Sequence, residues 1–199
     1  MQESDATTRV SWLRVGHMTE LEQRKYKICL IGENAVGKTS LIQRFVHNEF
    51  SDHYLTTIGT KISKKDVVVT YPDQDKKYDI TMMIWDIMGQ KGFRPILSHS
   101  YFHMAKGGIA VCDLTRPHTL EELTGWIESM FEITGNIPVI VVANKNDLTD
   151  EIRINEEDIS ALAEQYDSPF LYTSAKTSAN VEEAFLSIGR MVTEHQFQV

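Results

Sequence analysis

The chain has 199 residues, a length that suits one α/β domain with a complete hydrophobic core. Its formal net charge of -8, without a cluster of basic residues, argues against nucleic acid as a partner, because phosphate backbones are bound through many Lys and Arg contacts. No apolar run approaches the roughly 20 residues that a membrane-spanning helix needs.

Residues 1–23 differ in composition from the remainder, and we expect them to form an extension before a folded domain at residues 24–195. The extension is either a flexible segment or an amphipathic helix that contacts a membrane or the domain surface. A start of the chain at Met18 is a further interpretation. The apolar residues with a loose helical spacing are Val10, Leu13, Val15, Met18 and Leu21.

The first predicted strand, Tyr26–Ile31, leads into Gly32–Thr39, which reads G-x-x-x-x-G-K-T, and then into the helical pattern Ser40–Val46. This order is the context of a phosphate-binding loop, in which backbone N–H groups and a helix N-terminus surround an anion. Lys38 would contact the terminal phosphates and Thr39 would ligate Mg²⁺. Both flanking elements disfavour the alternative of a simple glycine turn with an exposed lysine. The residues expected at the nucleotide are Asn34, Ala35, Val36, Gly37, Lys38, Thr39 and Ser40.

A later strand, Ile80–Trp85, ends in an Asp-x-x-Gly-Gln sequence. Asp86 can hold Mg²⁺, generally through water, and the N–H of Gly89 can bond a γ-phosphate oxygen. Gln90 is then placed to orient the attacking water, and Thr57, upstream, can close over the same metal. Taken alone, Thr57 would be an ordinary residue at a strand entry and Gln90 a solvated loop residue.

The choice of base is indicated by an Asn-Lys-x-Asp sequence directly after the apolar strand pattern Val139–Ala143. The carboxylate of Asp147 can accept hydrogen bonds from the N–H and NH₂ groups of guanine, which adenine does not offer, so we expect GTP rather than ATP. Asn144 would hold the loop and the base, and the stem of Lys145 would cover the ring. An Asx turn at a strand end is the alternative for the tetrapeptide alone, and an ATP-dependent P-loop kinase finds no support in it.

A strand is also predicted at Ile62–Val69, and a polar hairpin loop joins it to the strand that ends in Trp85, which extends back to Tyr78. The hairpin makes the first of these strands the antiparallel edge of an otherwise parallel sheet. Thr119 and Glu122 form a predicted capping box, and Asn180 is the predicted N-cap of the last helix. The remaining elements are strand 108–114, helix 120–133, helix 156–166, strand 170–172 and a final helix whose core stripe is Val181, Ala184, Phe185, Ile188 and Val192.

From about Tyr26 to Val192 the chain resembles a small GTPase of the Ras superfamily, closest to the Rab branch. The Rab-like features are Ser51–Gly59, Trp85–Asp86, Gln90 and Phe93–Arg94. The resemblance implies a three-layer P-loop G domain with a mostly parallel six-stranded sheet, one antiparallel edge strand and helices on both faces. It also implies GTP or GDP as the ligand, with Mg²⁺ held by Thr39, Thr57 and Asp86.

The resemblance adds residues around the base. The ring of Phe50 would lie against the base, and the N–H of Ala175 would contact the guanine oxygen. The added nucleotide-binding residues are Phe50, Tyr54, Ser174, Ala175 and Lys176, and the residues implied in catalysis are Lys38, Thr57 and Gln90.

The chain also departs from the Rab pattern. Ile87-Met88 stands where Rab proteins usually have Thr-Ala, and Lys91-Gly92 replaces Glu-Arg after the glutamine. Asn34 occupies a loop position near the entry of a partner's arginine, and Thr60–Ile62 replaces the Val-Asp-Phe of Rab effector binding. The hydrolysis rate, the regulators and the effectors therefore stay open.

The expected function is that of a GTP-binding switch with slow hydrolysis, which works as a monomer with effectors, an exchange factor and an activating protein. No arginine lies between Asn48 and Thr57, so a partner would supply the transition-state charge, with Arg94 as the nearest internal rival. The alternative is a GTPase-like scaffold that binds nucleotide without cycling, because Ile87, Met88 and Lys91 alter the hydrolytic loop.

No signal peptide, myristoylation glycine or C-terminal prenylation cysteine is expected from the sequence. We therefore expect a cytoplasmic protein without a lipid anchor, with peripheral membrane contact only through a partner or the extension. Cys29 and Cys112 fall in predicted buried strands and are expected to be reduced core thiols.

Overall fold

The computed structural model describes residues 21–51, 57, 59–71, 76–89 and 99–198. The residues 1–20 of the predicted extension, together with Tyr54, Gln90 and Arg94, lie outside this range. The elements in chain order are β1 (Leu21–Ile31), α1 (Lys38–His47), β2 (Thr60–Tyr71), β3 (Lys76–Ile87), β4 (Gly107–Asp113), α3 (His118–Glu121), α4 (Leu123–Thr134), β5 (Val139–Asn144), the 3₁₀ turn η3 (Thr149–Glu151), α5 (Glu156–Gln165), β6 (Phe170–Tyr172) and α6 (Val181–Gln198).

The six strands form one sheet in the order β2-β3-β1-β4-β5-β6. Only β2 runs antiparallel to its neighbour, paired with β3 from Thr60 opposite Ile87 to Tyr71 opposite Lys76. The other pairs are parallel. The predicted mostly parallel sheet with one antiparallel edge strand is confirmed.

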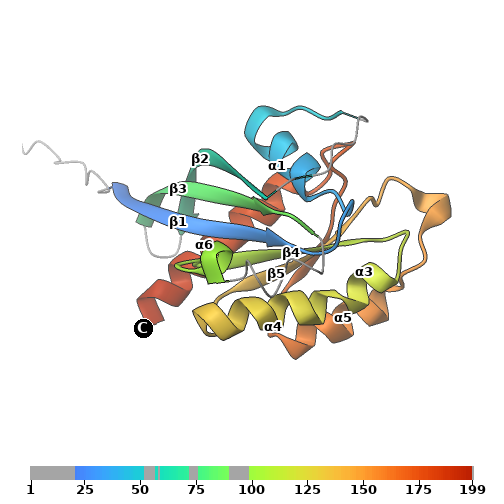
Figure 1. Ribbon diagram of the computed structural model, residues 1–199. Helices are drawn as coiled ribbons and strands as arrows, with labels where there is room; N and C mark the ends of the chain where they lie inside the picture. The colour runs from blue at the N-terminus through green and yellow to red at the C-terminus, as the bar shows by residue number, and fades with distance from the viewer. Residues whose placement is uncertain (1–20, 52–56, 58, 72–75, 90–98, 199) are drawn as a thin grey trace, which may run out of the picture.

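Alternating side chains of the central strands build a separate core on each face of the sheet. In β1, Ile28 and Leu30 pack on the side of α1 and α6, whereas Cys29 and Ile31 pack on the side of α3, α4 and α5. Figure 1 shows α4 and α5 together below the sheet, opposite α1. Because both faces are covered, the central strands are apolar on both sides, which is typical of a parallel sheet.

The start of the domain differs from the prediction. Strand β1 begins at Leu21 and pairs in parallel with β3 from Leu21 opposite Lys77 onward, so it reaches three residues into the predicted extension. The assignment of Leu21 to a helical stripe was therefore wrong, because the residue belongs to the sheet. The nature of the preceding residues stays a prediction.

The predicted capping box was also wrong. Pro117 precedes the first helical residue, His118, so Thr119 lies inside α3 rather than before a helix. The Thr119 hydroxyl accepts a hydrogen bond from the Asp113 N–H at 2.9 Å and donates one to the Arg116 carbonyl at 2.7 Å. Helix α4 starts at Leu123 without a side-chain cap from Glu122. Proline is favoured in the first turn of a helix, because its fixed φ suits that position and its missing N–H is not needed there, and Pro117 has helical dihedrals; this explains why the helix starts earlier than predicted.

Asn180 directly precedes α6, and its carbonyl accepts a hydrogen bond from the Ala184 N–H at 3.1 Å. Its side-chain amide donates to the Tyr172 carbonyl at 2.9 Å and so ties the helix start to β6. Cys29 and Cys112 are buried in strands, as predicted, and burial raises the pKa of both thiols to about 12. In the described part of the chain, none of the helices combines the length and the apolar character needed to cross a membrane.

Candidate functional site: a nucleotide pocket

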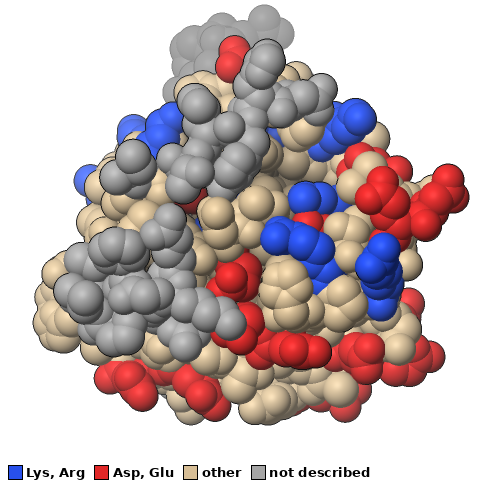
Figure 2. All heavy atoms as spheres, turned by 45° about the vertical axis from the view of Figure 1, so that its right-hand side comes forward, with Lys and Arg blue, Asp and Glu red and all other residues tan. Residues whose placement is uncertain are grey.

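A pocket of about 460 Å³ lies where the carboxyl ends of the parallel strands meet α1 and the loop before α6. Figure 2 shows this side of the molecule, where Lys and Arg side chains gather to the right of centre although the net charge is negative. The predicted site residues that line the pocket are Asn34, Ala35, Gly37, Lys38, Thr39, Ser40, Phe50, Thr57, Gly89, Asn144, Lys145, Asp147, Ala175 and Lys176. The predicted residues Val36, Asp86 and Ser174 are buried beside it.

Lys38 is fixed at the first residue of α1. Its side chain is only 6% exposed, and its Nζ donates hydrogen bonds to the carbonyls of Gly32 and Glu33, both at 2.8 Å. Burial lowers the pKa of Lys38 to about 8, although the nearby carboxylate of Asp86 opposes this effect. The phosphate loop therefore curls around a desolvated ammonium group, which an incoming anion would stabilise.

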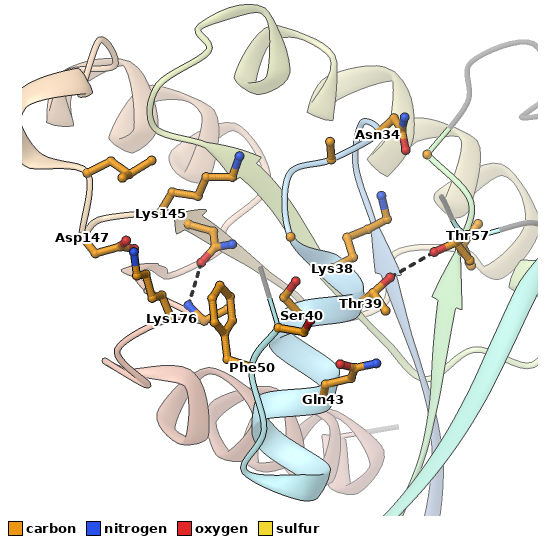
Figure 3. A pocket seen from close by; sticks show the side chains of 18 residues that line it. Asn34, Lys38, Thr39, Ser40, Gln43, Phe50, Thr57, Lys145, Asp147 and Lys176 are labelled. Atoms are coloured by element: carbon orange, nitrogen blue, oxygen red, sulfur yellow. Dashed lines mark hydrogen bonds between the residues drawn. The ribbon is translucent and has the colours of Figure 1, made fainter. Parts of the chain in front are cut away.

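Three oxygen-bearing side chains converge beside Lys38. The Thr39 hydroxyl donates to Asp86 Oδ2 at 2.5 Å and lies 3.0 Å from the Thr57 hydroxyl, which is 3.4 Å from the same carboxylate oxygen. Figure 3 shows the approach of Thr39 and Thr57 from two separate segments. The other oxygen, Asp86 Oδ1, is buried without a hydrogen-bond partner among the described residues, and burial raises the pKa of Asp86. Hydroxyl and carboxylate oxygens are ligands suited to Mg²⁺, so this set fits the metal.

Asn144 joins the phosphate loop to residues 174–176, which we call the base loop because the sequence predicts them at the base. Its Nδ2 donates to the Val36 carbonyl at 2.8 Å, and its Oδ1 accepts from the Thr173 hydroxyl at 3.1 Å and from the Ala175 N–H at 3.3 Å. Gly37 has a φ of 103°, and a Cβ at this position would lie 2.2 Å from Asn144 Nδ2. Only glycine permits both this backbone conformation and this close approach.

Asp147 lies at the opposite end of the pocket from Thr57 (Figure 3). The Ser174 hydroxyl donates to Asp147 Oδ1 at 2.6 Å and itself accepts a hydrogen bond from the Thr177 N–H at 3.0 Å. Because the Thr177 N–H fixes the Ser174 oxygen, the hydroxyl proton of Ser174 points to Asp147 and holds its carboxylate in one orientation. Phe50 and Lys176 flank this end of the pocket.

Four pocket residues were not among the predicted ligands, namely Gln43, Ser51, Ile87 and Leu148. Gln43 follows Thr39 by one helical turn on α1, so the helical period could have indicated it. Ile87 was noted only as a departure from the Rab pattern, but it is buried and forms part of the pocket wall.

Arg44 was also missed, although it holds the base loop in place. Its Nε donates to the Ala175 carbonyl at 2.9 Å and its Nη2 to the Lys176 carbonyl at 3.0 Å. Its Nη1 donates to both the backbone and side-chain oxygens of Asn48 at 3.0 and 3.2 Å, and the guanidinium carbon lies 6.0 Å from the centre of the Phe50 ring. One side chain thus connects α1, the base loop and the segment that leads to Thr57.

We expect Arg44→Met to lower the free energy of unfolding of the nucleotide-free protein by about 2 kcal/mol, because several carbonyl groups lose a charged donor. Urea denaturation of the wild type, Arg44→Met and Arg44→Lys would measure this. Arg44→Lys should lose less, since it retains a donor but not the planar fork of the guanidinium. Equal stability of all three proteins would contradict the assigned role.

The fold and the pocket together define a Ras-like P-loop G domain. The chain belongs to the Ras family, whose model matches residues 27–194. Among similar proteins, the Ras-related protein RABD2b of Arabidopsis thaliana is 37% identical over 82% of this chain and 78% of the relative. RABA1g from the same plant is 37% identical over 82% and 72%, and RABD2a is 35% identical over 85% and 80%. The resemblance to a Ras superfamily GTPase close to the Rab branch is confirmed.

Proposed function

We propose that this protein is a molecular switch that binds GTP with Mg²⁺ and hydrolyses it slowly to GDP. The proposal is carried by one observation. A single pocket has an ammonium and three converging oxygen ligands at one end and an oriented carboxylate, Asp147, at the other. A nucleotide bound in this pocket would contact both ends, because residues of both ends line the same cavity.

In this proposal, Lys38 and the backbone N–H groups of the phosphate loop bind the terminal phosphates. Thr39, Thr57 and Asp86 would hold Mg²⁺, which supplies positive charge that neutralises the phosphate oxygens. Thr57 and Gly89 belong to two loops that would contact the γ-phosphate. When hydrolysis removes the γ-phosphate, both loops would be released, and the surface offered to effectors would change. An exchange factor and an activating protein would control the cycle.

The base would be read by Asp147, while Phe50, Lys145 and Lys176 contact the ring. The Ala175 N–H already donates to Asn144 Oδ1, so a guanine oxygen would share this donor. We further propose that the protein acts in the cytoplasm as a monomer, with peripheral membrane contact through partners or through residues 1–23.

Nucleotide content and turnover, measured on one preparation, test the proposal. Heat-released nucleotide should be GDP or GTP, and added GTP should be converted to GDP in a Mg²⁺-dependent reaction. Bound guanine nucleotide without any turnover, even over many hours, would favour the non-cycling scaffold. If the preparation holds no guanine nucleotide and ATP competes for the site as well as GTP does, both the switch and the scaffold would be contradicted.

Hydrolysis by the isolated protein should be slow and should depend on Gln90. No arginine lies between Asn48 and Thr57, and an arginine at the transferred phosphoryl group is worth about 10³ to 10⁵ in rate. Single-turnover assays of the wild type, Gln90→Leu and Arg94→Ala are the measurement. Fast hydrolysis that survives Gln90→Leu but is lost in Arg94→Ala would point instead to an internally catalysed enzyme.

Gly89 lies directly against the phosphate loop. A Cβ at Gly89 would come within 2.5 Å of the Glu33 carbonyl carbon and 2.6 Å of the Asn34 nitrogen. Gly89→Ala should therefore push the loop that contains residue 89 away from the phosphate loop. It should weaken the binding of GTP by roughly tenfold relative to that of GDP, since overpacking of this kind costs about 1–3 kcal/mol. Titrations with a non-hydrolysable GTP analogue and with GDP would give the ratio. An unchanged ratio would mean that Gly89 does not sense the γ-phosphate.

A further inference from the structure

Asp113 is a fully buried carboxylate at the last residue of β4, between the two loops that form the nucleotide pocket. Strand β4 lies between β1, which leads into the phosphate loop, and β5, which leads into Asn144 and Lys145. Asp113 is paired in register with Asn144. The topology therefore places an acidic group under the pocket, at the junction of its phosphate half and its base half.

Both oxygens of Asp113 are fully engaged. Oδ2 forms ion pairs with Lys145 Nζ at 2.6 Å and with Arg116 Nε at 2.8 Å. Oδ1 accepts hydrogen bonds from the N–H and the hydroxyl of Thr115 at 3.0 and 2.8 Å. Burial would raise the pKa of Asp113, but the hydrogen bonds from Lys145, Thr115 and Arg116 outweigh this effect and lower it. Asp113 is thus an anion at neutral pH and holds two cations together.

Each of the two cations continues to one half of the pocket. Arg116 donates from Nη2 to the carbonyl of Asn34, in the phosphate loop, at 3.1 Å. Lys145 belongs to the segment that ends in Asp147 and lines the pocket, as Asn34 does (Figure 3). A continuous path of polar contacts runs from the phosphate loop through Arg116 and Asp113 to residues 144–147, which we call the base-reading segment.

We propose that Asp113 and Arg116 are positioning residues that tie the phosphate loop to the base-reading segment and thereby slow nucleotide release. This inference rests on the proposed nucleotide switch. A ligand that bridges two loops leaves most easily when one loop opens by itself, and the tie prevents such separate opening. Nε and Nη2 of Arg116 are already engaged by Asp113 and by a loop carbonyl, so its role is to position the loop rather than to touch the transferred phosphate.

The test is the dissociation rate of fluorescently labelled GDP, measured with excess unlabelled GDP at fixed Mg²⁺. Asp113→Asn and Arg116→Gln should each accelerate release about tenfold, the size expected for loss of a hydrogen bond to a charged group. The double variant should be no faster than the faster single variant, because both changes break the same path. Arg190→Gln is the matched control, because Arg190 lies on α6, where its Nη2 pairs with Glu183 and donates to the Ser187 hydroxyl at 3.1 Å, and it does not line the pocket. Its release rate should equal that of the wild type.

Two further measurements, on Arg116→Lys and on the melting temperature, separate positioning from general stability. Arg116 is about one third exposed, so Arg116→Gln should fold even if Asp113→Asn does not, and it then decides the matter alone. Arg116→Lys keeps the positive charge but loses the planar guanidinium fork, so its release rate should lie between those of Arg116→Gln and the wild type. The melting temperature of nucleotide-free Arg116→Gln should match the wild type. Release within twofold of the wild type, additive effects in the double variant, or lost single-turnover hydrolysis with unchanged release would each overturn the tie. Failure of the wild type to bind labelled GDP would instead refute the proposed function.

Discussion

Asp147→Asn should lower the affinity for GTP by about a hundredfold or more and raise the affinity for xanthosine triphosphate. In the wild type, the Ser174 hydroxyl donates to Asp147 Oδ1, and its own oxygen is occupied by the Thr177 N–H. In the variant, the amide oxygen would keep this hydrogen bond, and the NH₂ group would turn toward the ligand. A donor then faces the donor groups of guanine, and buried mispairing of this kind costs several kcal/mol. The oxo group of xanthine would accept from the same NH₂.

Competitive displacement of a labelled guanine nucleotide by GTP, xanthosine triphosphate and ATP would measure the three affinities. Asp150→Asn is a suitable control, because Asp150 is an exposed residue of η3 only three positions away. An unchanged preference in Asp147→Asn would show that Asp147 does not face the base. Effective competition by ATP in the wild type would contradict the guanine assignment itself.

Lys38→Met should weaken triphosphate binding by about a hundredfold, since a charge-assisted contact to phosphate is lost while the length of the side chain is retained. The ammonium is buried among loop carbonyls, so solvent cannot replace it. Titration with a non-hydrolysable GTP analogue at saturating Mg²⁺ would give the affinities of the wild type and of Lys38→Met. Lys77→Met, at an exposed position of β3 outside the pocket, is the control for loss of a lysine charge and should leave GTP binding unchanged. Equal affinity of Lys38→Met and the wild type would refute the phosphate site.

The lowered pKa of Lys38 also sets a direction for the pH dependence of stability. Its pKa is about 8 in the folded, nucleotide-free protein and 10.5 without burial, so the unfolded chain binds more protons between these values. Stability contributed by this group therefore rises as the pH rises from about 8 to 10.5. Urea denaturation should show the wild type gaining about 2 kcal/mol relative to Lys38→Met between pH 7.5 and 10. A constant difference would mean that Lys38 is not desolvated.

The parts of the site that the sequence predicted are those with local signatures. The phosphate loop needs its glycines, its lysine and its threonine within eight consecutive positions, and Asp147 follows a strand pattern by four residues. The alternation of the sheet faces likewise follows from neighbouring residues. The capping box failed for an equally local reason, because Pro117 moved the helix start ahead of Thr119.

The unpredicted parts depend on residues that are distant in sequence. Arg44 reaches the base loop 131 positions later, and Arg116 reaches Asn34 across 82 positions. No pattern around either arginine indicates its partner, since each contact exists only after the sheet has set the strand order. Asp113 falls inside the predicted strand 108–114 without any motif around it, and only the register of β4 against β5 makes it a neighbour of the nucleotide loops.

The two ends of the described chain emerge together, away from the pocket. Strand β1 begins beside Tyr78, and the last turn of α6 brings Phe197 to the same place, where its ring lies 5.4 Å from that of Tyr78 and near Arg24. Helix α6 starts at the base loop and spans about 27 Å over its 18 residues, so it carries the chain to the far edge of the sheet (Figure 1). A group attached at either end, such as a fluorescent protein, would thus lie at the end of the domain opposite the pocket and leave the pocket accessible to nucleotide.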